Sequence, residues 1–287
     1  MTRIRPALHN SALRGETFNL EQKAALAQKY GYAGLDFSIA DITGHAGGDP
    51  ASVKACLARY DVEPNIVTGV LSSQLFAAEA QWEPAVGQIK ERARLAASIG
   101  GARSTAVFWN RVNQPTEEVR QQTLRRLRQI DKELEGTGIR MGVKYLGVRS
   151  LYPERPYAFI QSLAEARQLF AEAQVQHFGW TIDSYHWYAA GDTVDAIRQL
   201  IDPPIVALHL NDARDLPLDQ LDDKDRLMLG DGVIPLTGLV DAAVAAGFDG
   251  FVALEVMGPS VAGMDADTCA REGMQAMRRV WPDVGAA

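Results

Sequence analysis

Short apolar segments rich in β-branched residues alternate with longer segments of helical spacing along the chain. Eight of the short segments are predicted strands, at residues 4–9, 33–38, 63–68, 102–108, 140–146, 178–183, 205–210 and 251–256. Seven intervening segments repeat apolar residues at helical spacing and are predicted helices, at residues 20–30, 53–60, 83–99, 116–134, 157–173, 193–201 and 236–246. This alternation is typical of β-α-β units built around a parallel sheet.

Eight strands within 287 residues favour a (β/α)₈ TIM barrel, an α/β fold, forming one domain over residues 1–287. An open doubly wound sheet is the alternative, but no Gly-x-Gly-x-x-Gly turn follows an early strand to support dinucleotide binding. No low-complexity linker divides the chain, and its longest loop is predicted at residues 211–233.

Composition narrows the class of protein. The 29 Lys and Arg against 36 Asp and Glu give a formal charge of −7, which argues against binding to nucleic acid. Two distant cysteines, Cys56 and Cys269, exclude a disulfide framework. The sequence offers no signal peptide and no apolar run of membrane-spanning length, so we expect a cytoplasmic protein without a membrane partner. Whether the protein forms a homo-oligomer stays open, because the periodicity of apolar residues does not reveal which surfaces associate.

Four strands of the second half run apolar and then deliver a polar residue near their C-terminal ends. These residues are Lys144, Asp183, His209 and Glu255. In a barrel, the C-terminal strand ends converge on the active-site mouth. One such residue alone is more often a cap or a loop anchor, but the four together predict a polar active site. Carboxylates with a neutral imidazole suit Mn²⁺, Mg²⁺ or Zn²⁺.

Two of these strand ends carry further polar groups. His186 follows Asp183 by three positions, and Asp212 follows His209 by three. The other histidines have no polar neighbours of this kind. The positions of His9 and His45 allow either side chain to reach the mouth of the barrel. For these two and for His177, however, a structural role is the simpler interpretation.

Aromatic residues accompany the predicted mouth. Trp109 follows the fourth strand, and Tyr185 and Trp187 flank His186. Flat rings with polar tips suit the C–H faces of a sugar or cyclitol, although packing between barrel and helices is the commoner role of any one ring. Arg149 and Arg155 follow the fifth strand without a Gly-rich phosphate loop, so we do not expect a phosphorylated substrate.

With these residues the chain resembles the xylose-isomerase-like TIM barrels, which include sugar isomerases, epimerases and endonuclease IV-type enzymes. Within this family the resemblance is strongest to the bacterial inosose (2-keto-myo-inositol) isomerases. The likeness covers nearly the whole chain and is densest after residue 141. It implies one divalent metal, Mn, Mg or Zn, with Asp183, His209 and Glu255 as ligands. It also implies that His186 contacts substrate and that Arg226 belongs to a loop over the site.

The fourth ligand position departs from the family pattern, because Lys144 stands where the family has Glu. In the family, the formal charges of two Glu, one Asp and a divalent ion sum to −1. In this chain, the formal charges of Lys144, Asp183 and Glu255 without an ion also sum to −1. We therefore hypothesise that the ammonium takes the electrostatic role of the metal, which is then absent. A natural departure with altered chemistry and a substitution introduced to inactivate the enzyme both stay open.

The resemblance implies an isomerase or epimerase of a small polyhydroxylated ketone or sugar, acting by proton transfer next to a carbonyl through an enediolate. Glu255 is the expected base, and His186, Trp109, Tyr185, Trp187 and Arg226 are the expected substrate contacts. Lys144 either stabilises the oxyanion or transfers the second proton; adjacent carboxylates favour the cationic role. Activity on inosose is expected to be weak or lacking. The alternatives are a keto-cyclitol dehydratase or lyase and a catalytically silent sugar-binding barrel.

Overall fold

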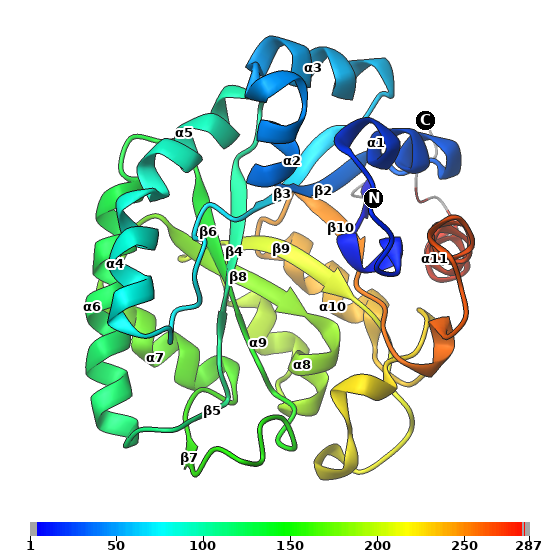
Figure 1. The fold of residues 1–287 in the computed structure, drawn as a ribbon. Coiled ribbons are helices and arrows are strands. Elements are labelled where there is room, and N and C mark those ends of the chain that lie inside the picture. The colour runs from blue at the N-terminus through cyan, green and yellow to red at the C-terminus, as the bar shows by residue number, and fades with distance from the viewer. Residues whose placement is uncertain (1–4, 283, 285–287) are drawn as a thin grey trace.

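The computed structural model describes residues 5–282 and residue 284, so Ile4 of the first predicted strand lies outside it. Eight parallel strands form the barrel: β1 (Arg5–Leu8), β2 (Gly34–Ser38), β3 (Glu63–Thr68), β4 (Arg103–Phe108), β6 (Arg140–Tyr145), β8 (Phe178–Asp183), β9 (Ile205–Leu210) and β10 (Phe251–Leu254). They are ordered β3-β2-β1-β10-β9-β8-β6-β4, and β3 and β4 pack side by side to bring the sheet almost full circle. The predicted TIM barrel is therefore confirmed (Figure 1).

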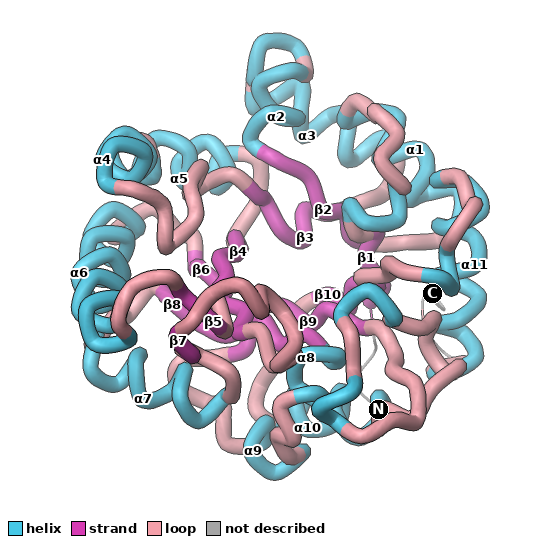
Figure 2. Tube along the Cα trace, turned by 60° about the horizontal axis from the view of Figure 1, so that its bottom comes forward, coloured by secondary structure: helices cyan, strands magenta, loops and turns pink. Residues whose placement is uncertain are grey.

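Helices form the outer layer around these strands (Figure 2). They are α1 (Leu20–Tyr30), α2 (Ile39–Gly44), α3 (Pro50–Arg59), α4 (Glu79–Gly87), α5 (Ile89–Ser98), α6 (Thr116–Leu134), α7 (Leu163–Ala173), α8 (Ser184–Ala189), α9 (Val194–Arg198), α10 (Leu236–Ala245) and α11 (Ala266–Val280). Among the described residues, no helix combines the length and the apolar character needed to cross a membrane.

Two predicted helices differ from those observed. Residues 83–99 form two helices, which meet at Gln88 directly after Gly87, a poor helix former. Helix α7 begins at Leu163, where the Ser162 side chain caps it, and not at residue 157. Residues Tyr157–Ala158 instead form β7, which pairs antiparallel with β5 (Arg111–Val112).

The sequence pattern missed α2, α8 and α11. The first two are only six residues long, too short for a periodic signal. Helix α11 is longer and strongly amphipathic, so its pattern was present in the sequence, although its buried face includes small residues such as Ala266, Ala270 and Gly273. Its N-terminus is marked by Asp265, whose side chain accepts a hydrogen bond from the Thr268 N–H.

Two glycines make room inside the barrel wall. Gly142 of β6 and Gly179 of β8 are register partners. A Cβ at Gly179 would lie 2.5 Å from Val206 Cγ2 and 2.3 Å from the Pro204 carbonyl oxygen, and a Cβ at Gly142 would lie 3.1 Å from Val206 Cβ. The side chains of Val206 in β9 and Thr181 in β8 thus occupy the space that the two missing side chains leave, which sets how closely these strands approach.

We predict that Gly179→Ala lowers the free energy of unfolding by roughly 1–3 kcal/mol, because the added methyl group meets backbone that has no room to yield. Gly87→Ala is the matched control, since a Cβ there has no neighbour within 4 Å. It is expected to be neutral or slightly stabilising. Urea denaturation of both variants measures the difference, and an equal effect of the two substitutions would contradict the packing argument.

Candidate active site

The barrel brings the polar residues of four strand ends together. Lys144 lies near the end of β6, Asp183 ends β8, His209 pairs in register with Asp183, and Glu255 directly follows β10. The Lys144 Nζ donates hydrogen bonds to Asp183 Oδ2 at 3.1 Å and to Glu255 Oε2 at 2.7 Å. The His209 Nδ1 lies 2.9 Å from the same Glu255 oxygen. Residues more than a hundred positions apart thus form one buried ionic cluster.

A second cation enters this cluster from the loop after β9. Arg226 is only 1% exposed, and its Nη1 donates to Asp183 Oδ2 at 3.0 Å. Its Nη2 donates to Asp223 Oδ1 at 2.6 Å and lies 3.2 Å from His186 Nε2. The Lys144 ammonium and the Arg226 guanidinium therefore face the buried carboxylate of Asp183 and the partly exposed carboxylates of Glu255 and Asp223.

The two carboxylates differ in how many of their oxygens are held. Asp183 Oδ1 accepts from the Tyr185 backbone N–H at 3.0 Å and from the Asn211 amide at 3.2 Å, so both of its oxygens are engaged. Glu255 Oε1 has no hydrogen-bond partner among the described residues, whereas Oε2 has two. Asp183 is fixed as a structural anchor, and Glu255 keeps one oxygen for other partners.

Electrostatics keep the cluster ionised. Burial favours the neutral amine, but the charges of Glu255 and Asp183 outweigh it and raise the pKa of Lys144. Burial would raise the pKa of both carboxyls, yet Lys144 holds the pKa of Glu255 well below its usual value, and Arg226 with Lys144 does the same for Asp183. Lys144 is therefore a cation at neutral pH and not a free base.

His186 behaves differently from these charged groups. Burial lowers its pKa to about 4, because desolvation outweighs the attraction of Asp183. Its Nε2 faces the Arg226 guanidinium, which donates to it, so Nε2 carries the lone pair. The imidazole is thus neutral at physiological pH.

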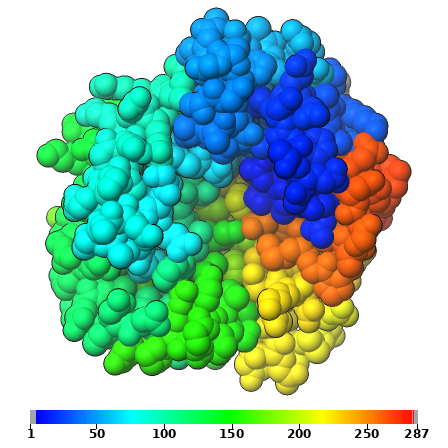
Figure 3. Space-filling model, viewed as in Figure 1, coloured from blue at the N-terminus to red at the C-terminus, as the bar shows by residue number. Residues whose placement is uncertain are grey.

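A cavity of about 370 Å³ opens beside the cluster, and a hollow is visible there between the cyan, green, yellow and orange segments (Figure 3). Its lining combines the charged groups with apolar and aromatic side chains. The lining residues that bear on the chemistry are Trp109, Lys144, Tyr152, His186, Asp223, Arg226 and Glu255. The size suits one small ligand.

Two predicted substrate contacts do not line this cavity. The Tyr185 hydroxyl donates to the Asp222 carbonyl at 2.6 Å, and the Trp187 indole N–H donates to the Thr193 carbonyl at 3.4 Å. Both rings are buried in the wall around the site. Successive residues of a helix point about 100° apart, so the turn of α8 that directs His186 inward directs its neighbours elsewhere. Neither ring lines the cavity, so the contact of these two residues with a substrate stays a prediction.

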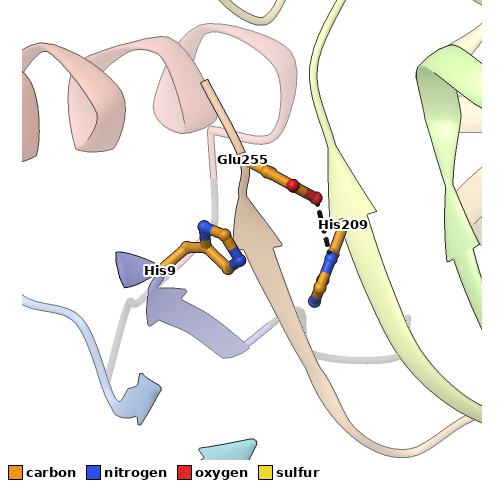
Figure 4. A group of neighbouring side chains, drawn as sticks. All are labelled: His9, His209 and Glu255. Atoms are coloured by element: carbon orange, nitrogen blue, oxygen red, sulfur yellow. Dashed lines mark hydrogen bonds and ion pairs between the residues drawn. The ribbon is translucent and has the colours of Figure 1, made fainter. Parts of the chain in front are cut away.

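His9 joins the site, although a structural role was the simpler interpretation of its position in the sequence. Its ring centroid lies 4.8 Å from that of His209, and ligand-type atoms of His9, His209 and Glu255 all lie within 4.8 Å of one another (Figure 4). Behind it, Asp36 Oδ2 lies 3.8 Å from His9 Nε2. Burial raises the pKa of Asp36 to about 6. The sequence could have indicated this position for His9, because His9 lies at the C-terminal end of the first strand just as His209 lies near the C-terminal end of the seventh.

Asp212 organises the long loop that carries Arg226. Its carboxylate accepts from the backbone N–H groups of Gly230 at 3.0 Å, Gly232 at 3.1 Å and Ile234 at 2.9 Å. The backbone of Asp212 also pairs with that of Leu227 in both directions. Three charge-assisted bonds fold the loop back over the strand ends.

The donor set does not fit the metal that the family pattern implies. An ion bound by both carboxylates needs oxygens about 2.0–2.2 Å away. That position lies between Asp183 Oδ2 and Glu255 Oε2, where the Lys144 ammonium already contacts both oxygens. An ion held by His9, His209 and Glu255 would lie next to the ammonium, which contacts Glu255 Oε2 at 2.7 Å, and would be repelled by it. A divalent ion and a protonated Lys144 therefore compete for the same carboxylates.

We predict that Lys144→Met lowers the free energy of unfolding by roughly 3 kcal/mol at neutral pH, because Glu255 loses its principal buried partner. The control is Lys29→Met, which removes an exposed lysine from its pair with Asp267 and is expected to change stability little. Urea denaturation of both variants measures the difference. Equal effects would show that the buried cluster is not a structural element.

The lowered pKa of His186 predicts a pH dependence. Because about 4 lies below the usual 6.5, His186 contributes stability above pH 6.5 that is lost as the pH falls from 6.5 through 4. Asp36 acts oppositely, since its raised pKa adds stability as the pH falls from 6 towards 3.8. NMR titration of the imidazole separates the two: the His186 resonances are expected to stay constant from pH 8 to about 5. A midpoint near 6.5 would refute the assignment of a neutral ring.

Comparison with known proteins places this geometry in a family. Residues 24–280 match the model of the xylose isomerase-like TIM barrel. The inosose isomerase of Bacillus velezensis is 22% identical over 259 residues, which cover 87% of this chain and 88% of that enzyme. The match to the Bacillus subtilis inosose isomerase, at 23% identity, spans 168 residues, 58% of this chain and 56% of that enzyme.

Solved structures agree over almost the full length. A xylose isomerase domain protein from Alicyclobacillus acidocaldarius is 30% identical, with a TM-score of 0.86 over 98% of this chain and 99% of that one. The IolI protein, solved with a bound zinc atom, shares the fold at 18% identity, with a TM-score of 0.77 over 96% of this chain and 98% of that one. The chain belongs to the xylose isomerase-like TIM barrel family.

Proposed function

We propose that this protein is an isomerase-type enzyme for a small polyhydroxylated ketone of the inosose class, and that the Lys144 ammonium stabilises the reaction's oxyanion in place of a metal. The proposal depends on one observation. Lys144 is held between Asp183 and Glu255 and at the same time lines the cavity. A fixed positive charge at the end of an apolar-walled pocket is suited to the negative charge that develops on a carbonyl oxygen.

Lys144 supplies the electrophile. An ammonium group has three N–H donors, and two of them are used by Asp183 and Glu255. The third is available to the cavity, where it donates to the carbonyl oxygen of the substrate. As the neighbouring C–H bond breaks, this hydrogen bond strengthens because the oxygen acquires charge.

Glu255 supplies the base. Its Oε2 is held by Lys144 and His209, which fixes the carboxylate plane. Its Oε1 has no hydrogen-bond partner within the described part of the chain, and the residue lines the cavity. The Oε1 atom removes the proton from the carbon next to the carbonyl and later returns it to the neighbouring carbon. Lys144 thus binds both the base and the oxyanion, so it fixes their relative position.

Three further residues bind the substrate. His186 and Arg226 present polar groups to the hydroxyls, and Trp109 adds apolar surface to the cavity wall. Its ring is stacked on Phe76 at 4.9 Å between centroids, and the Arg155 guanidinium lies 3.9 Å from its centroid. The same first step begins a β-elimination, so a dehydratase or lyase would use this site identically until the leaving group departs. The identity of the product decides between the two reactions.

The test is proton exchange. In D₂O with 2-keto-myo-inositol, the wild-type protein is expected to exchange the proton next to the carbonyl and to form the shifted ketone, as followed by ¹H NMR. Glu255→Gln should slow both by about 10²–10⁴-fold, because general base catalysis is lost. Glu63→Gln, at the opposite end of the barrel, is the control. Binding of the ketone without exchange would instead identify a silent sugar-binding barrel, and an unsaturated product would identify a dehydratase.

A second prediction concerns residue 144, the position that the family resemblance assigns to a metal ligand. Lys144→Glu removes the ammonium and adds a carboxylate, so it should create tight Mn²⁺ binding beside Asp183, His209 and Glu255 and raise turnover on the same ketone. Isothermal titration with Mn²⁺ measures the first effect and the NMR assay the second. If the variant gains neither affinity nor turnover, the family mechanism does not apply to this site.

A further inference from the structure

A second carboxylate with a free oxygen lines the same cavity. Asp223 lies in the short 3-10 turn Asp223–Asp225 of the loop after β9. Its Oδ1 accepts from Arg226 Nε at 3.0 Å and from Nη2 at 2.6 Å, whereas Oδ2 has no hydrogen-bond partner among the described residues. The side chain is 19% exposed and lines the cavity. Asp223 therefore repeats the arrangement of Glu255, with one oxygen held and one available.

The two carboxylates lie on either side of one guanidinium. Arg226 Nη1 is 4.0 Å from Glu255 Oε2, while Nη2 is bonded to Asp223 Oδ1. Arg226 itself is anchored by Asp183 at 3.0 Å and is buried. Because the guanidinium is planar and rigid, it fixes the separation of Asp223 and Glu255 across the end of the cavity.

The loop around Asp223 is held in place and is not a free flap. Gly258 permits the close approach, because its φ of +85° suits glycine and a Cβ there would lie 1.9 Å from the Lys224 carbonyl oxygen. The Ser260 hydroxyl donates to the Arg226 carbonyl at 3.0 Å, and Asp222 Oδ1 accepts from the Lys224 N–H at 3.0 Å. Together with the bonds to Asp212, these contacts preorganise Asp223 at the cavity.

We propose that Asp223 is the second proton-transfer group of the site and moves the proton of a substrate hydroxyl, while Glu255 moves the proton bound to carbon. This inference rests on the proposed isomerase function. Asp223 would thus provide a second carboxylate beside Glu255, on a loop and not at the end of a strand.

The transfers balance without another reactant. Glu255 Oε1 takes the proton from the hydroxyl-bearing carbon, the C–H electron pair becomes the C=C bond, and the carbonyl electron pair moves to oxygen. Asp223 Oδ2 takes the proton of the neighbouring hydroxyl and delivers it to the former carbonyl oxygen. As the new carbonyl forms, Glu255 returns its proton to the former carbonyl carbon. Both carboxylates are restored, and the ketone has moved by one position.

The two roles are separable in one experiment on the full-length protein. With 2-keto-myo-inositol in D₂O, Asp223→Asn should keep C–H exchange within about threefold of wild type, because Glu255 and Lys144 remain. It should slow formation of the shifted ketone by about 100-fold. Asp223→Glu keeps a carboxylate and should regain at least a tenth of that rate. Asp225→Asn, in the same turn but outside the cavity lining, is the control and should match wild type.

Other outcomes overturn the assignment. If Asp223→Asn isomerises the ketone at the wild-type rate, no proton passes through residue 223. If exchange and isomerisation fall by the same factor and Asp223→Glu restores neither, the residue only holds Arg226 in position. An absence of exchange in the wild-type protein, with this ketone and with D-tagatose as a second ketose, would refute the proposed function itself, which distinguishes that failure from this one.

Discussion

The contact of the Lys144 ammonium with two buried carboxylates is the interaction on which the site depends. Isolated charges in the interior of a barrel cost several kcal/mol each, so they persist only when paired and hydrogen-bonded. Lys144 satisfies Asp183 and Glu255 at once, and Arg226 completes the balance on Asp183. The three strands that supply these groups are thereby tied together at the end where the cavity opens.

In the proposed function an ammonium takes the role of a divalent ion, which changes the available chemistry more than the charge count suggests. A metal polarises a carbonyl as a Lewis acid and binds two oxygens of the substrate, whereas an ammonium offers directed hydrogen bonds and a single charge. The raised pKa of Lys144 keeps that charge in place but removes the amine as a base or nucleophile. In the proposed mechanism the proton transfers fall to Glu255 and Asp223, each of which has one oxygen without a hydrogen-bond partner among the described residues.

One sequence pattern was enough to predict both the barrel and the site residues that lie at the ends of its strands. A strand with a continuous apolar run that ends in a polar residue fixes both the fold and the direction of that residue, as Asp183 and His209 illustrate. Tyr185 and Trp187 lie outside the cavity lining, because a short helix follows β8 and turns its neighbouring side chains apart. Asp223 was not singled out in the sequence. Its position depends on a loop that Asp212 folds and that packs closely against Gly258, and these contacts join residues that are remote in sequence.

The most direct measurement is the metal content of the protein purified without chelators, determined by inductively coupled plasma mass spectrometry. If Lys144 carries the charge that the family assigns to an ion, the protein should contain well under one-tenth of an equivalent of manganese, zinc or magnesium per chain. One equivalent of any of them, retained after gel filtration, would mean that the ammonium yields its place to a metal and would contradict the account.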